Sequence, residues 1–185
     1  MFLLEWIERL GALLLDGIVA TGNFVIFLFA GLRYMITPPY KPRLWIRQMR
    51  SIGAESLYLI IWIGGFTGMV LGLQGFNTLR RFGSEGALGT VVALILVREL
   101  GPVLAALMVA ARAGSAMAAE IGSMQATEQV DALSVMAINP VQYLVSPRML
   151  AGIISVPLLT IMFDVIGILG GYLIGVDLMG APGSS

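Results

Sequence analysis

The sequence predicts an all-α fold: a polytopic bundle of membrane helices in a single transmembrane domain, residues 1–185. Composition is the first reason, because 58% of the residues are hydrophobic and only 12% are charged, whereas soluble domains carry about 25% charged residues. The second reason is three apolar stretches, at 57–79, 88–121 and 143–176. Each can cross a hydrocarbon core of about 30 Å at about 1.5 Å per residue.

Composition also excludes several chemistries. The chain has no cysteine and no histidine, which removes thiol chemistry, zinc sites and histidine acid–base catalysis. Lys41 is the single lysine and Pro42 follows it, so a phosphate-binding loop cannot form. We therefore expect no catalytic residue, metal or cofactor in this chain. The zero net charge gives no reason to expect a nucleic-acid partner.

The N-terminal 36 residues predict two helical segments. Residues 1–10 are amphipathic and read as a short interfacial helix. Residues 11–36 are long enough to span, but Asp16, Thr21 and Asn23 lie in their first half. Two readings stay open for this segment: it spans, or it lies embedded at the interface.

The next segment sets the topology. Prolines at 38, 39 and 42 interrupt the helix, and Arg43, Arg47 and Arg50 follow. Such a basic cluster belongs in the cytoplasm by the positive-inside rule. The first clear span then leaves the cytoplasm, the second returns, and residues 123–147 are cytoplasmic.

Small residues recur every fourth position in all three clear spans. Positions four apart share a helix face, so each series predicts close helix–helix packing. The series are Gly64, Gly68 and Gly72; Ala106, Ala110, Gly114, Ala118 and Gly122; and Gly167, Gly171 and Gly175.

The clearest candidate site is Arg98 and Glu99, followed by Pro102, inside the second span. A charge at the centre of a membrane helix costs about 3 kcal/mol and usually faces the bundle interior or a water-filled cavity. The side chains of adjacent residues in a helix point about 100° apart, so we expect Arg98 and Glu99 each to need a partner other than the other. Pro102 predicts a kink in this helix. Gln74, near the outer end of the previous span, is the expected companion. The alternative is a structural pair that fixes helix packing.

Three other charged residues are weaker candidates. Arg112 and Glu120 are expected to fix the cytoplasmic end of their helix by snorkelling. Asp164, inside the third span, suits a salt bridge to another helix as well as a substrate contact.

The polar connection predicts a short helix at 127–138. Thr127 is a candidate N-cap, and Glu128 and Asp131 lie in the first turn, where the helix dipole favours acids. This helix is either a simple connector or a surface that docks on another protein.

Several separated motifs, in order, resemble the MlaE family of ABC-transporter permeases. They are VLGLQG at 70–75, RELGP at 98–102, AEIG at 119–122, TEQ at 127–129, NP at 139–140 and SPR at 146–148. The resemblance implies a multi-pass inner-membrane permease, not itself an enzyme. It would move phospholipids between the inner and outer membranes and so maintain outer-membrane lipid asymmetry.

The resemblance also implies partners and sites. A homodimer would enclose a lipid cavity lined by Leu71, Gln74, Arg98 and Glu99. A cytoplasmic ATPase, which holds the ATP and Mg, would dock on the coupling helix through Thr127, Glu128, Gln129, Asp131 and Leu133. A periplasmic lipid-binding subunit with an MCE domain would sit above. Residues 1–36 would be interfacial or embedded, and two further membrane helices, expected after 176, are absent from the chain.

Two other functions remain open on the residues alone. An ion-coupled secondary transporter would use Glu99 or Asp164 as a proton relay. A non-transporting assembly subunit would only scaffold its partners, which leaves Arg98 and Glu99 unexplained.

Overall fold

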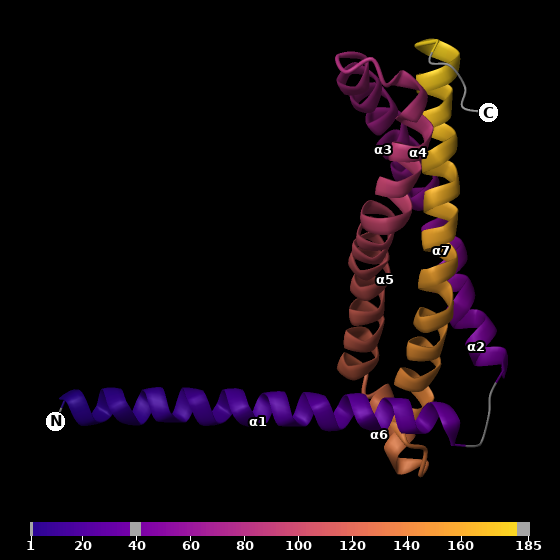
Figure 1. The fold of residues 1–185 in the computed structure, drawn as a ribbon. Coiled ribbons are helices and arrows are strands. Elements are labelled where there is room, and N and C mark those ends of the chain that lie inside the picture. The colour runs from indigo at the N-terminus through magenta and orange to yellow at the C-terminus, as the bar shows by residue number, and fades with distance from the viewer. Residues whose placement is uncertain (1, 38–41, 181–185) are drawn as a thin grey trace.

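The computed structural model describes residues 2–37 and 42–180, and these ranges are helical apart from short turns. Three long helical rods stand side by side, and a fourth helix, α1, runs crosswise at their foot (Figure 1). The structure thus confirms the predicted all-helical bundle, with four helical stretches long and apolar enough to cross a membrane within the described ranges.

Each rod is longer than its predicted span, because interfacial turns and wide π-helical turns extend it. The continuous stretches are Pro42–Arg80, Glu85–Ala126 and Val141–Leu178. The first comprises α2 (Pro42–Met49) and α3 (Glu55–Arg80), the second α4 (Leu88–Ile95) and α5 (Gly101–Ala126), and the third α7 (Ser146–Tyr172). The π-helical turns are Arg50–Ala54, Leu96–Leu100, Val141–Val145 and Leu173–Leu178, and α6 (Gln129–Val135) connects the second and third rods.

The N-terminal segment differs from its prediction, because α1 (Phe2–Ile36) is one continuous helix and not two. A lone glycine such as Gly11 costs only about 1 kcal/mol relative to alanine in a helix, too little to break an otherwise apolar one. Helix α1 touches the bundle near its C-terminal end. A Cβ built on Gly31 would lie 2.6 Å from the sulfur of Met149, and the Asn139 amide donates a hydrogen bond to the Tyr34 hydroxyl at 2.9 Å.

Helices α3 and α7 pack through two of the predicted small-residue series. A Cβ on Gly68 would collide with the carbonyl of Gly167, and one on Gly72 would lie 2.7 Å from the carbonyl oxygen of Gly171. Backbone therefore meets backbone along this contact, as expected where small residues drive association in lipid. The prediction of close packing is confirmed for these two series.

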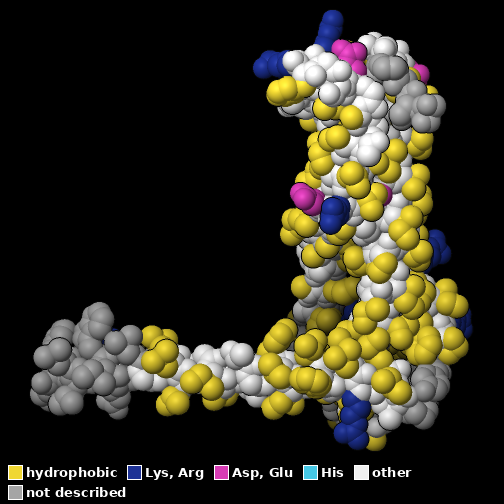
Figure 2. Space-filling model, in the orientation of Figure 1, with side chains coloured by type: hydrophobic (Ala, Val, Ile, Leu, Met, Phe, Trp, Pro, Cys, Tyr) yellow, Lys and Arg dark blue, Asp and Glu magenta, His cyan; other side chains and the backbone are white. Residues whose placement is uncertain are grey.

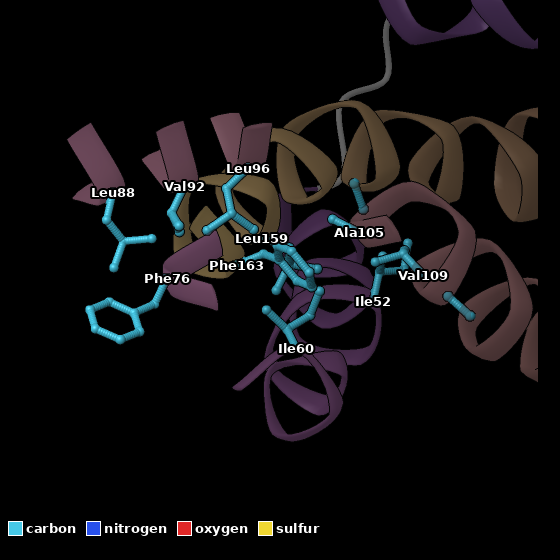
Figure 3. Close-up of a cluster of buried hydrophobic side chains, with 12 residues drawn as sticks. Ile52, Ile60, Phe76, Leu88, Val92, Leu96, Ala105, Val109, Leu159 and Phe163 are labelled. Atoms are coloured by element: carbon cyan, nitrogen blue, oxygen red, sulfur yellow. The ribbon is translucent and has the colours of Figure 1, made fainter. Parts of the chain in front are cut away.

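Large side chains of α4 and of the π-helical turn that follows it pack against the glycines of α7 beside this contact. Leu88, Val92 and Leu96 follow one another at four-residue spacing, and Figure 3 shows them in a row. Val92 Cγ1 lies 2.9 Å from a Cβ built on Gly171, and Leu96 Cδ1 lies 3.0 Å from one built on Gly167. Glycine on one rod and aliphatic side chains on the next thus interlock to form the core.

The prediction of close packing is wrong for the small-residue series on α5, because this series meets no other helix in the described structure. Cβ atoms built on Gly114 and Gly122 would meet nothing within 4 Å, and Ala106, Ala110 and Ala118 are exposed. The buried stripe of α5 lies one position earlier, at Ala105, Val109 and Ala113. Spacing identifies a helix face but not what that face meets, and here α5 diverges from α7 toward the foot (Figure 1).

Candidate functional site

Arg98 and Glu99 lie on the π-helical turn Leu96–Leu100, about a third of the way along the second rod from its Glu85 end. Leu96 of this turn is fully buried, whereas both charged side chains are exposed on the outside of the bundle. Figure 2 shows acidic and basic side chains close together at mid-height on an otherwise apolar face. Within residues 2–37 and 42–180, neither Arg98 nor Glu99 has an ion-pair partner. The two do not pair with each other, as expected for adjacent positions on a helix, and the other partner expected for each is not among these residues.

The backbone at this site is irregular because Pro102 has no amide hydrogen to donate. The amide of Gly101 donates to the carbonyl of Leu96, five residues back, which widens the turn. The predicted disturbance therefore occurs just before the proline and takes the form of a π-helical turn. Such turns are rare and frequently lie at functional sites.

Asp164 of α7 lies against this turn from the other side. Its Oδ1 would collide with a Cβ on Gly101, so glycine is required there. The same oxygen is buried and has no hydrogen-bond partner in the described structure. From the sequence Asp164 is only a weak candidate, because nothing in the residue spacing indicates that it meets the Arg98–Pro102 segment.

Gln74 and Leu71 of α3 do not join the charged pair directly. Gly75, next to Gln74, faces Leu88 and Val92, and Arg98 lies six residues beyond Val92, or about 9 Å along the axis. The exposed Gln74 instead lines a polar hollow with Asn77, Thr78, Arg80 and Arg81. Leu71 is half-buried and packs against the core. Within a single chain Gln74 therefore lies apart from the charged pair, and its place in a shared site stays a prediction.

Two ion pairs link α5 to its neighbours in the half of the bundle near α1, one to α3 and one to α7. Arg112 donates to Glu55 Oε2 at 2.6 Å, to the Ser51 carbonyl at 3.1 Å and to the Ser56 hydroxyl at 3.1 Å. Arg148 donates to Glu120 Oε2 at 2.6 Å. Arg112 and Glu120 thus fix this end, as predicted, but through bonds to other helices and not by snorkelling to water. The sequence pointed to Arg148 only as part of the SPR motif at 146–148.

The polar helix is shorter than the predicted 127–138, since α6 spans Gln129–Val135. Thr127 is not its N-cap, because the hydroxyl donates to the Ser123 carbonyl at 2.8 Å and so belongs to the end of α5. Glu128 takes the N-cap position with φ of 57° and no side-chain cap. Asp131 lies in the first turn, and Leu133 is half-buried. Val135 and Met136 are 88% and 62% exposed, which leaves an acidic and apolar surface at the foot.

These features define a polytopic helical membrane protein with mid-span charges on its outer face and a polar, partly apolar helix between two rods. The chain belongs to the MlaE permease family. The model of that family, described as "Permease MlaE", matches residues 45–185.

Similar proteins agree with this assignment. The intermembrane phospholipid transport system permease protein MlaE of Haemophilus influenzae is 45% identical over 185 residues, 99% of this chain and 70% of that protein. A probable ABC transporter permease protein of Rickettsia felis is 48% identical over 85% of this chain and 61% of its own length. Protein TRIGALACTOSYLDIACYLGLYCEROL 1, chloroplastic, of Arabidopsis thaliana is 37% identical over 70% of this chain and 37% of that protein. The chain thus spans about three fifths of the length of several curated relatives it matches.

Proposed function

We propose that the chain is the permease subunit of an ABC transporter that moves phospholipids between the inner and outer membranes and so maintains outer-membrane lipid asymmetry. Family membership and the 45% identical H. influenzae phospholipid permease support this proposal. The protein would be a multi-pass component of a bacterial inner membrane. ATP and Mg would be bound by a separate ATPase subunit.

The exposed, unpartnered Arg98 and Glu99 are the observation that carries the proposal. Each would cost about 3 kcal/mol if left facing hydrocarbon at mid-span, so both need a polar partner beyond the residues that the structure describes. A second permease copy and a phospholipid head group supply such partners together. A homodimeric cavity lined by Arg98, Glu99, Gln74 and Leu71 meets this need, and it brings Gln74 near the pair from the other copy.

The two ends of the bundle would contact the two partner proteins, the ATPase and the MCE-domain subunit. Helix α6, with Glu128, Gln129 and Asp131 beside the exposed Val135, offers a small acidic and apolar surface for the ATPase. Thr127, whose hydroxyl donates to the Ser123 carbonyl, and the half-buried Leu133 would complete this surface. The opposite end, near Arg80 and Arg81, would face a periplasmic MCE-domain lipid-binding subunit. Helix α1, crosswise to the rods, would lie at the cytoplasmic interface.

The test is lipid transfer by the permease reconstituted with its ATPase in proteoliposomes. Arg98→Ala and Glu99→Ala should each reduce ATP-driven transfer about tenfold or more, since a hydrogen bond to a charged group contributes about 1.5–3 kcal/mol. Both side chains are exposed, so thermal stability should stay unchanged. Arg9→Ala, exposed on α1 far from the charged pair, is the control. Wild-type transfer by both alanine variants would refute the lipid-contact assignment.

One observation favours a second candidate, an ion-coupled transporter. The Oδ1 atom of Asp164 is buried and unpartnered beside Gly101, as a proton-carrying carboxyl would be. Transport driven by a proton gradient without ATP, and lost in Asp164→Asn, would support this alternative over the ABC permease.

A further inference from the structure

A crevice opens between α5 and α7 in the half of the bundle near α1. It has a volume of about 420 Å³, and Figure 2 shows the hollow above the crosswise helix. Its α5 side runs from Ala106 to Ile121, a length of about 22 Å. One leaflet of hydrocarbon is about 15 Å deep, so the crevice is long enough to hold an acyl chain.

The walls of this crevice are apolar apart from one side chain. Phe27 of α1 lines it at the foot, Gly114 and Met117 line it on α5, and Gly152 and Val156 line it on α7. Gly114 and Gly152 have nothing within 4 Å of a built Cβ, so the space between the rods is open there.

The exception is Arg148, which lines both the crevice and a second hollow of about 170 Å³ beside it. Its side chain is 6% exposed. One terminal nitrogen bonds Glu120 and another bonds the Leu144 carbonyl, but the buried Nε–H has no acceptor in the described structure. Leaving a buried donor unsatisfied costs about 1–3 kcal/mol, so this position calls for an external acceptor.

The second hollow is polar and lies at the cytoplasmic end. Arg47 and Gln48 of α2 line it with Glu120 and Arg148. Arg47 is exposed and has no acidic partner in the part of the chain that the structure describes. Glu120 neutralises one of the two arginines, and one positive charge remains, which matches a single phosphodiester.

We propose that this pair of hollows binds one anionic phospholipid of the cytoplasmic leaflet. Its phosphate accepts from Arg47 and from Arg148 Nε, and an acyl chain lies in the crevice between α5 and α7. Basic pockets between helices on the cytoplasmic side are the usual place for such head groups. This site lies at the opposite end of α5 from the Arg98 and Glu99 pair and goes beyond the proposed transport function.

The test counts lipids retained by the purified permease complex in native mass spectrometry, with phosphatidylglycerol and phosphatidylcholine as the probes. The wild type should retain phosphatidylglycerol in preference to phosphatidylcholine. Arg47→Gln should weaken phosphatidylglycerol binding about fivefold, the effect of one basic residue at the membrane surface. Gly114→Leu should fill the crevice and lower retention of both lipids without disturbing the fold.

Two matched variants serve as controls. Arg43→Gln removes a charge from the same helix α2 outside the hollow, and Gly122→Leu adds the same side chain at an open position of α5 outside the crevice. Both should bind phosphatidylglycerol like the wild type. Equal losses in the controls would show loose surface attraction, and retention of neither lipid by the wild type would show that protein covers the crevice. Displacement of the lipid by millimolar inorganic phosphate would show a free-phosphate site. Any of these three results would overturn the proposal.

Discussion

Gly68 lies so close to the backbone carbonyl of Gly167 that no side chain fits between them. This contact lies in the middle of the α3–α7 interface, where both helices bury glycine. Helix association in lipid depends on such close approach. The contact therefore determines how the first and third rods stand relative to each other.

Gly68→Ala should destabilise the bundle. The added methyl group overlaps the Gly167 carbonyl, so the rods must move apart, at a cost of about 1–3 kcal/mol. The loss is measured as a lower midpoint of thermal unfolding in detergent. Gly122→Ala is the control, since its Cβ meets nothing within 4 Å, and it should unfold no earlier than the wild type. A Gly68→Ala protein as stable as this control would contradict the packing described.

The two ion pairs at the foot should differ in their contribution to stability. Glu120→Ala leaves a guanidinium that is 6% exposed without its counter-charge, and we expect a loss of about 1–3 kcal/mol. Glu55→Ala leaves Arg112, which is 29% exposed and keeps two other acceptors, so the loss should stay below about 1 kcal/mol. Unfolding of both variants side by side measures the difference. The reverse order would mean that burial of Arg148 does not control the strength of its pair.

Ala137→Gly should stabilise the end of α6. Ala137 has φ of 58°, and its amide and that of Ile138 bond back to Ser134 and Leu133, the arrangement in which helices usually place glycine. Relief of the left-handed strain should contribute up to about 1 kcal/mol. Ala132→Gly, inside the same helix, should instead cost about 1 kcal/mol. Hydrogen exchange of the α6 amides distinguishes the two, and slower exchange in the Ala132 variant would be inconsistent with this account.

Charge reversal on α6 should release the ATPase. With Glu128→Lys and Asp131→Lys combined, the acidic part of the surface becomes basic while the exposed Val135 remains. We expect the ATPase to be lost from the purified complex, as judged by co-purification. Glu85→Lys, at the far end of the bundle, should retain it. Normal stoichiometry in the double variant would place the docking surface elsewhere.

Composition and spacing predicted the helical membrane class, the three rods and the glycine faces through which α3 and α7 pack, because hydropathy and four-residue periodicity are local properties of the chain. They also located the charged pair and the disturbed turn before Pro102. The ends of the helices were less predictable. Thr127 has the side chain of an N-cap, but its hydroxyl is used by the preceding helix, and only the three-dimensional path of the chain decides between these roles.

Contacts between distant residues could not be predicted for the same reason. These contacts depend on the axial offset between neighbouring helices. They include the pairing of Arg148 with Glu120, the position of Asp164 against Gly101 and the separation of Gln74 from Arg98. That offset results from the fit of Leu88, Val92 and Leu96 over the glycines of α7. No single segment of sequence contains that information.

The π-helical turn Leu96–Leu100 also acts as a phase shift within the second rod. One extra residue rotates everything that follows by about 100° relative to an uninterrupted α-helix. The upper half of the rod can therefore aim Leu88 and Val92 at α7, while the lower half independently aims Ala105 and Val109 inward. Deleting one residue from the turn would force both halves into a common register. One of the two faces would then rotate away from the core, although every hydrophobic residue involved would still be present.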